Sequence, residues 1–383
     1  MNTSRDLLAQ LVRFDTTSRE SNLALIDFVR TYLQDHGVAC ELVYNAHKSK
    51  ANLLATIGPA DVPGIVLSGH TDVVPVDGQR WTVAPFELTE KDGHLYGRGT
   101  ADMKGYIACV LASVPALMQA PLRMPVHIAL SYDEEVGCLG VRALIERFHG
   151  QTVKPLLCVI GEPTELKPVL GHKGKLAVRC DVHGVACHSA YAPSGVNAIE
   201  YAACLISELV RLGETLKAPQ QRDSRFDPPF STVQTGVING GKALNIVPQH
   251  CAFDFEVRSL PGQDPWQVAQ QLRDYAERSL LPAMRAVSAD CAISISELSS
   301  YPGLATALDS QAAEWAAQFC GSRDFGTVAF GTEGGLFDQA GIPTVVCGPG
   351  SMAQGHKPDE FISVAQLAAC DRMLERVLAF VRQ

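Results

Sequence analysis

Short apolar runs that alternate with helical stretches constrain the fold of this sequence more than any other feature. Strands and helices that alternate along a chain form mostly parallel sheets, with helices packed on the sheet faces. We therefore predict an α/β fold with a mostly parallel mixed sheet flanked by helices. The predicted strands are Gly64–Ser68, Val126–Ser131, Leu156–Ile160 and Thr344–Cys347. One or two helices are expected within residues 6–36, and further helices at Met103–Met118, Cys138–Phe148, Ala307–Phe319 and Val364–Arg382.

The pattern changes between about Lys175 and Ser300. Residues 176–182 alternate as a half-exposed strand does, and helices fit Asn197–Leu212 and Trp266–Leu280. Two helices among antiparallel strands indicate a separate α+β unit. A chain of 383 residues is long enough for two domains. We predict a larger domain of residues 1–175 and 299–383, interrupted by a smaller inserted domain of residues 176–298.

Composition and charge exclude several classes of protein. The chain is 46% hydrophobic and 19% charged, with a net charge of −9 and no basic run that could neutralise a row of phosphates. Its apolar runs are far shorter than the ~20 residues of a membrane span, and its first residues contain no secretory stretch. The twelve cysteines are scattered without a C-x-x-C pair. We expect reduced thiols in a cytoplasmic protein that binds neither nucleic acid nor membrane.

Residues that can bind a metal follow four of the predicted strands. His70 follows the first strand, Glu135 the second and Glu162 the third, and His356 lies in the glycine-rich loop after the fourth. In open α/β sheets, ligands bind beyond the carboxyl ends of the strands. We therefore expect these side chains to converge.

The types of side chain limit the cofactor. Two imidazoles and several carboxylates, without cysteine, suit zinc or a neighbouring divalent ion such as cobalt. A single catalytic zinc ion usually takes three protein ligands. Five candidates therefore predict two metal ions that share one carboxylate, and Asp102, on a glycine-rich turn before a helix, is the natural bridge. The candidate ligands are His70, Asp102, Glu135, Glu162 and His356.

Two further carboxylates have predicted roles in catalysis. Glu134 is adjacent to a ligand and is interpreted as the general base that takes a proton from the attacking water, a role that requires a dry setting to raise its pKa. Asp72, two residues after His70, is expected to hold the other ring nitrogen of that histidine.

Each candidate has a simpler explanation when taken alone. A histidine after a strand is usually a hydrogen-bonded loop residue. Glu134 and Glu135 could complement the dipole of a helix, and Glu162 before a proline could be part of a turn. The four coincident positions at strand ends together favour the metal centre.

At these residues the sequence resembles the M20 family of metallopeptidases and amino-acid deacylases. The resemblance implies a catalytic domain interrupted by a lid domain that usually forms a homodimer. It also implies that His70 and Glu162 bind one metal, that Glu135 and His356 bind the other, that Asp102 bridges them and that Glu134 is the base. The matching segments are Ser68–Pro75, Gly97–Gly105, Asp133–Glu135, Gly161–Thr164, Gly184–Asn197 and Gly355–Glu360.

Within that family, the acetylornithine deacetylase branch is the most similar. The segments that indicate it are Trp81–Phe86, Gly161–Thr164 with His172–Gly174, Gly195–Glu200 and Thr332–Glu333. The resemblance implies hydrolysis of N2-acetyl-L-ornithine to L-ornithine and acetate. A succinyl-diaminopimelate desuccinylase, another N-acyl-amino-acid deacylase or a dipeptidase would share every metal residue. A metal-free binding protein is disfavoured, because a pure binder has no need of Glu134.

The resemblance extends to residues that contact substrate. His188 matches a histidine that reaches the partner subunit's active site and stabilises the oxyanion, and Asn245 matches a substrate-contacting asparagine. Arg258 matches an arginine suited to bidentate contact with an α-carboxylate, although a surface ion pair is the simpler interpretation. Thr332 and Glu333 are also assigned to substrate binding, and Glu333 is hypothesised to recognise the distal amine of the substrate from its charge and position.

Overall fold

The computed structural model describes residues 2–149 and 153–383 of the chain. The chain forms two compact units. The first unit, the outer unit, comprises Met1–His172, Leu304–Thr327 and Thr332–Gln383. The second, the inserted unit, comprises Lys173–Gly303 and Val328–Gly331. The catalytic and dimerisation roles that we assigned to the two parts of the chain stay predictions.

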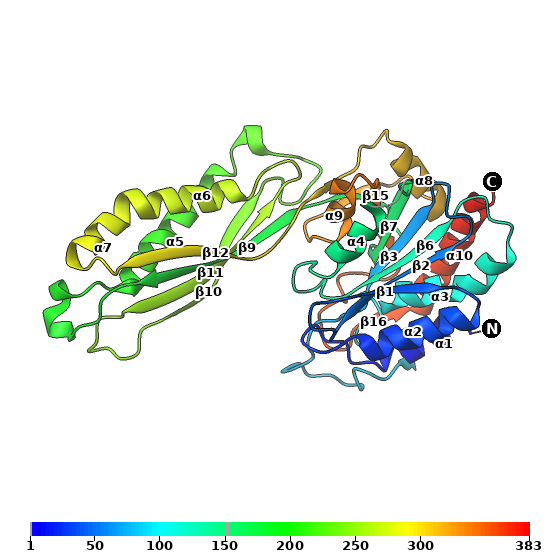
Figure 1. The fold of residues 1–383 in the computed structure, drawn as a ribbon, viewed down its shortest axis with the longest axis horizontal. Coiled ribbons are helices and arrows are strands. Elements are labelled where there is room, and N and C mark those ends of the chain that lie inside the picture. Colours follow the sequence, from blue (N-terminus) through cyan, green and yellow to red (C-terminus); the bar gives the residue numbers. More distant parts are fainter. Residues whose placement is uncertain (1, 150–152) are drawn as a thin grey trace. The chain divides into compact units, whose positions relative to one another are not determined.

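The outer unit is built on a nine-stranded mixed sheet with the strand order β1-β2-β6-β3-β7-β15-β8-β13, in which β14 also pairs with β8. The four strands at its centre, β6, β3, β7 and β15, are parallel to one another, and β2 and β8 pair antiparallel on either side of them (Figure 1). The strands are β1 Cys40–Tyr44, β2 Ala51–Ile57, β3 Ile65–His70, β6 Val126–Ser131, β7 Leu157–Pro163, β8 Val169–His172, β13 Leu304–Ala305, β14 Gly326–Val328 and β15 Thr344–Gly348. The central strands are buried along their whole length, as expected of parallel strands covered on both faces.

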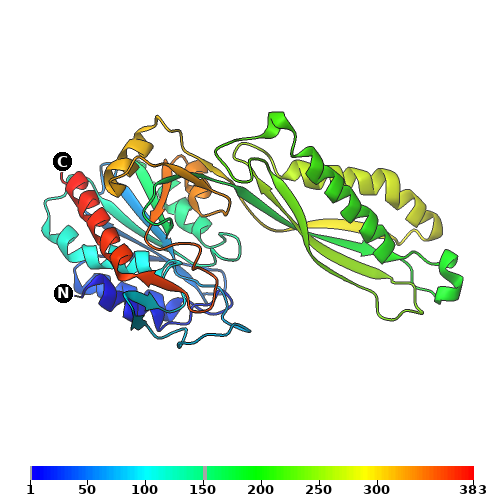
Figure 2. The same cartoon turned by 180° about the vertical axis from the view of Figure 1, so that it is seen from behind.

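Helices cover both faces of this sheet. Helices α1, α2, α3, α8 and α10 share one hydrophobic core with the sheet, whereas α4 and α9 contact strands from the other face. Figure 2 shows α10, in red, beside α3, in cyan. The helices are α1 Ser4–Val12, α2 Leu23–Asp35, α3 Lys104–Gln119, α4 Val141–His149, α8 Gln311–Cys320, α9 Gly334–Gln339 and α10 Val364–Val381. A small three-stranded sheet of β4 Thr89–Lys91, β5 His94–Tyr96 and β16 Phe361–Ser363 completes the unit.

The inserted unit is an antiparallel four-stranded sheet with helices packed on one face. Its strands have the order β10-β11-β9-β12, and residues of β9 and β11 alternate between buried and exposed positions. The buried positions form a separate core with α5 and α6. The elements are β9 Gly174–His183, α5 Ala198–Thr215, β10 Thr232–Gly240, β11 His250–Ser259, α6 Trp266–Tyr275, α7 Leu281–Val287 and β12 Ala292–Tyr301.

The predicted fold class is confirmed, and the differences concern the ends of some elements and strands that were not predicted. Helix α8 begins at Gln311 rather than Ala307, because the side chain of Ser310 caps it. Cys138 was predicted to be helical, but its φ of 55° places it in a turn before α4. Strand β12 has no counterpart among the predictions, because serines and glutamate interrupt its apolar pattern. No helix in the described part of the chain is long and apolar enough to cross a lipid bilayer.

Candidate metal centre

The central strands of the outer unit bring the predicted ligands to one edge of the sheet. His70 is the last residue of β3, and Glu162 lies near the end of β7. Glu135 follows β6, and His356 lies in the loop after β15. These four strands are consecutive in the sheet, so residues far apart in sequence lie close together. Asp102 joins them from the turn before α3.

Three buried side chains form the first group, which we call the buried triad. Nε2 of His70 lies 3.0 Å from Oδ1 of Asp102 and 3.5 Å from Oε1 of Glu162. All three side chains are at most 4% exposed, and the strands that present His70 and Glu162 pair with each other. The backbone of the sheet therefore fixes two members of the buried triad, His70 and Glu162.

The second group, which we call the open triad, shares Asp102 with the first. Nε2 of His356 lies 3.2 Å from Oδ2 of Asp102 and 3.1 Å from Oε2 of Glu135. Within each triad the candidate ligand atoms lie within 4.8 Å of one another. Asp102 therefore offers one carboxylate oxygen to each triad, as a bridging ligand would.

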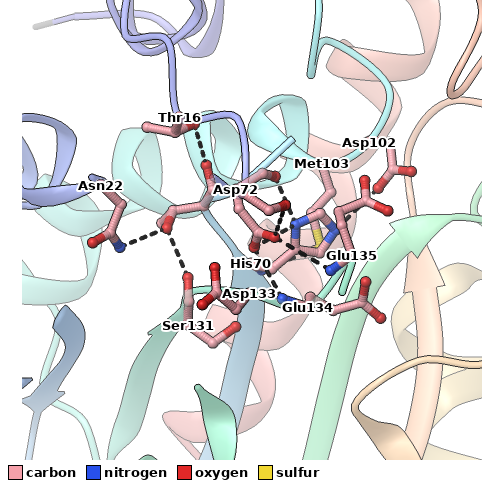
Figure 3. Close-up of polar contacts among 12 residues, drawn as sticks. Thr16, Asn22, His70, Asp72, Asp102, Met103, Ser131, Asp133, Glu134 and Glu135 are labelled. Atoms are coloured by element: carbon pink, nitrogen blue, oxygen red, sulfur yellow. Dashed lines mark hydrogen bonds and ion pairs between the residues drawn. The ribbon is translucent and has the colours of Figure 1, made fainter. Parts of the chain in front are cut away.

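Asp72 contacts His70 and also orders the chain that carries Glu134 and Glu135. Its main-chain carbonyl lies 2.9 Å from Nδ1 of His70, whereas its carboxylate is 3.6 Å from that atom. The carboxylate accepts hydrogen bonds from the backbone N–H groups of Glu134 and Glu135, at 3.1 and 3.2 Å, and from the hydroxyl of Ser18 at 2.8 Å. Asp72 thus connects a ligand of the buried triad to a ligand of the open triad (Figure 3).

The turn that carries Asp102 is held by a buried ion pair. Glu360 accepts hydrogen bonds from the backbone N–H groups of Ala101 and Asp102, at 2.9 and 3.1 Å. The other oxygen of the same carboxylate pairs with Arg98 at 2.7 Å, and both side chains are 1% exposed. The peptide bond between Asp102 and Met103 is cis.

The electrostatics of the centre suit cations. Burial and the charge of Asp102 raise the pKa of Glu162 well above its ordinary value, and burial raises the pKa of Glu135 to about 7. Hydrogen bonds to Asp102 and Glu135 raise the pKa of His356 to about 11. The raised pKa values mean that these groups bind protons more tightly than usual in the absence of metal, and divalent ions would replace such protons.

One atom in the open triad is unpaired in a manner that fits a metal ligand. Oε1 of Glu135 is buried and has no hydrogen-bond partner among the described residues. Buried polar oxygens rarely lack a partner, and an absent ion is one of the ordinary explanations. The residues that are present therefore fit two divalent ions with nitrogen and oxygen ligands.

Glu134 lies beside the two triads without being part of either. Burial raises the pKa of its carboxyl group well above the ordinary value. The thiol of Cys138 donates to its Oε1 at 3.5 Å. A raised pKa makes the carboxylate a better proton acceptor, as the role of general base requires.

The predicted substrate residues lie in two different units. In the outer unit, Thr332 and Glu333 are buried, and Glu333 accepts a hydrogen bond of 2.5 Å from the hydroxyl of Ser131, at the end of β6. Burial raises the pKa of Glu333 to about 7.

In the inserted unit, His188 and Asn245 are exposed, and the carbonyl of Asn245 accepts a hydrogen bond from the backbone N–H of Ser189 at 3.0 Å. Arg258 donates to the hydroxyl of Tyr301 at 2.9 Å and pairs with Glu256 at 3.2 Å. His188 and Asn245 therefore lie close together, and Arg258 takes part in an ion pair.

The sequence reasoning did not single out three residues that contact the site. Cys138 was assigned to a helix, although its position only four residues after Glu134 could have indicated a contact between the two side chains. Glu360 ends a segment that resembles the M20 family, yet nothing in its residue type points to contact with Asp102. Ser18 is remote from every motif, so its contact with Asp72 has no sequence signal.

Comparisons with known proteins identify the family. The model of peptidase family M20/M25/M40 matches residues 66–379. The chain belongs to this family. An acetylornithine deacetylase from Myxococcus xanthus is 37% identical over 382 residues, which cover 98% of this chain and 96% of that protein. One from Pasteurella multocida is 34% identical over 361 residues, which cover 94% of this chain and 91% of that protein. The predicted family and its most similar branch are therefore confirmed, and this M20 chain is a hydrolase that acts on amide bonds.

Solved structures confirm the fold. An M20 family metallo-carboxypeptidase from Sulfolobus solfataricus has a TM-score of 0.79 at 20% identity, with 100% of both chains covered. A dinuclear metal-binding peptidase of the M20 family from Bacillus subtilis has a TM-score of 0.67 at 15% identity, and the match covers 99% of this chain and 97% of that one. At these identities the likeness concerns the fold alone.

Proposed function

We propose that this chain hydrolyses N2-acetyl-L-ornithine to L-ornithine and acetate. The observation that carries the proposal is the pair of triads that share Asp102, with Glu134 beside them. Similarity over nearly the full length to acetylornithine deacetylases supports the choice of substrate within the family.

His70, Asp102 and Glu162 would bind one divalent ion, and Asp102, Glu135 and His356 would bind the other. Zinc is the ion that best suits two imidazoles with carboxylates, and cobalt is the alternative. Bound ions of this kind supply Lewis acidity, which polarises an amide carbonyl and lowers the pKa of a water molecule.

Glu134 handles the proton in this proposal. It takes the proton from the water that attacks the amide carbonyl and then delivers it to the nitrogen of the leaving amine. The raised pKa of Glu134 supports the first step, because it makes the carboxylate a better acceptor of the proton from water. The thiol of Cys138 and the backbone contacts of Asp72 hold the glutamate and its neighbour in place.

We assign recognition of the substrate to both units. Arg258 would contact the α-carboxylate, Asn245 would contact substrate and His188 would stabilise the oxyanion, in its own site or in that of a partner subunit. Thr332 and Glu333 would contribute to binding in the outer unit, with Glu333 facing the distal amine. If Glu333→Gln left kcat/KM for acetylornithine unchanged, Glu333 would have no part in recognising that amine.

A homodimer formed through the inserted unit is also part of the proposal. Strands β10 and β12 are the edges of its sheet, and Val237, Ile238 and Leu298 on these strands are about half exposed. Unpaired sheet edges with exposed apolar side chains are suited to association with a second copy.

Turnover of a panel of N-acetyl and N-succinyl amino acids and dipeptides, with and without a chelator, tests the function. We expect the largest kcat/KM with N2-acetyl-L-ornithine and loss of activity when metal is removed. A larger kcat/KM with a succinyl substrate or a dipeptide would replace the substrate that we propose. Full activity after complete removal of metal would refute the mechanism.

A further inference from the structure

The open triad depends on a loop, whereas the buried triad depends on strands. His356 lies between β15 and β16, with a φ of 64° and a side chain that is 50% exposed. Its imidazole contacts only other ligands, Asp102 and Glu135, among the contacts found in the described residues. The position of His356 therefore has to be set through its backbone.

Gln79 makes that backbone contact. Its side-chain Nε2 donates to the main-chain carbonyl of His356 at 3.0 Å. The other end of the same amide is held firmly, because Oε1 accepts from Nη2 of Arg98 at 2.6 Å and from Nε1 of Trp81 at 3.0 Å. The guanidinium of Arg98 also lies over the ring of Trp81, 5.0 Å from its centroid.

Arg98 links this contact to the bridging ligand. Its Nη1 pairs with Oε2 of Glu360 at 2.7 Å, and Oε1 of Glu360 accepts from the backbone N–H of Asp102 at 3.1 Å. One buried guanidinium thus connects the backbone of His356, through Gln79, to the backbone of Asp102, through Glu360. We call Gln79, Trp81, Arg98 and Glu360 the Arg98 network.

We propose that Gln79 is a positioning residue for the open triad: it fixes His356 relative to Asp102 and so sets the metal affinity of this half of the centre. The inference rests on the proposed function, because it requires that the two triads bind metal. Among the hydrogen bonds of the described residues, Gln79 makes no direct contact with His70, Asp102 or Glu162, so we expect its side chain to affect the affinity of the open triad and not that of the buried triad. The Arg98 network could otherwise serve only to stabilise its loops, and the experiment separates the two roles.

The test measures zinc binding to metal-free protein by calorimetric titration and equilibrium dialysis, for wild type, Gln79→Glu and Gln79→Ala. Gln79→Glu is the sharper variant, because a carboxylate can still accept from Arg98 and Trp81 but cannot donate to the carbonyl of His356. We expect two zinc ions per wild-type chain. In both variants one site keeps its affinity and the other weakens by about 10- to 100-fold, the usual effect of removing a contact that orients a metal ligand.

Two further variants calibrate the result. His356→Ala removes a ligand of the open triad and should weaken the same zinc site more strongly. Thr82→Val is the matched control, because the hydroxyl of Thr82 donates to Asp359 at 2.9 Å in the same loop but contacts no ligand. Its two zinc sites should retain wild-type affinity. Circular dichroism and thermal unfolding of the metal-free variants check that each chain is folded.

Four results would overturn the inference. Unchanged affinity at both sites in Gln79→Glu would show that its contact with His356 is dispensable. Equal weakening of both sites, or weakening in Thr82→Val as large as in Gln79→Glu, would show a general effect on the loops. If wild type bound fewer than two zinc ions, both this inference and the proposed metal centre would fail, whereas the first three results leave the proposed function intact.

Discussion

The buried triad and the open triad share Asp102 but are held in different ways. His70 is 1% exposed and lies at the end of a central strand, whereas His356 is 50% exposed and lies in a loop. The sheet therefore fixes one half of the centre, and side-chain contacts fix the other. The comparison teaches that one triad can be built largely into the core while its neighbour depends on a few hydrogen bonds.

The largest effect on activity is expected from substitution of Glu134, which belongs to neither triad. Glu134→Gln should lower kcat by about 10²- to 10⁴-fold, because it removes the general base without removing a ligand. Zinc content should stay at the wild-type level in both triads. Steady-state kinetics and metal analysis of the purified variant check this, and full turnover by the variant would exclude a role for Glu134 in proton transfer.

The two histidines should differ in their effect on stability. In the metal-free protein, His70→Ala leaves the buried Glu162 without its imidazole partner and Asp102 with His356 alone, a change that costs about 3–5 kcal/mol of unfolding free energy. His356→Ala should cost less than His70→Ala, because the side chain of His356 is half exposed and solvent screens its contacts. Urea unfolding of both variants measures the difference. Equal losses would mean that the two triads are equally embedded in the fold.

Asp72 should affect both triads at once. Asp72→Asn replaces the carboxylate that lies 3.6 Å from Nδ1 of His70 by a neutral amide. It also removes one of the two oxygens that accept the backbone N–H groups of Glu134 and Glu135. We expect kcat/KM to fall by about 10- to 100-fold, with both zinc sites weakened. Zinc titration together with kinetics checks this. Weakening confined to one site would mean that Asp72 does not couple the triads.

The smallest expected effect is a difference in pH dependence. In the metal-free protein, the pKa of His356 is raised to about 11 by Asp102 and Glu135. A raised pKa in the folded state contributes stability that is fully present below the ordinary pKa of about 6.5 and is lost as the pH rises toward 11. His356→Ala should therefore flatten the decline in metal-free stability between pH 7 and 10.

Zinc-loaded protein should show the opposite trend, because zinc binding requires deprotonated ligands and strengthens as the pH rises. Unfolding midpoints measured over this pH range, with and without zinc, provide the check. Identical pH profiles for metal-free wild type and His356→Ala would contradict the proposed pairing of this histidine.

The sequence predicted the fold class and the convergence of the candidate ligands, because strand ends in a parallel sheet meet at one edge. The positions of the predicted strands were enough to predict that His70 and Glu162 lie close together. That these residues bind metal stays a prediction.

The contacts that hold the ligands could not be predicted in the same way. The hydrogen bond from Gln79 to His356 joins loops 277 residues apart, and neither residue belongs to a periodic pattern. The carboxylate of Asp72 was expected to hold His70, but the main-chain carbonyl makes the closer contact. Cys138 was placed in a helix because periodicity does not reveal a positive φ.

The central claim is that two cations are bound by the two triads with Asp102 between them. Anomalous diffraction at the zinc absorption edge, from crystals of the zinc-loaded protein, tests it most directly. We predict two peaks, one bonded to His70, Asp102 and Glu162 and the other to Asp102, Glu135 and His356. A single peak, or peaks away from Asp102, would contradict the account.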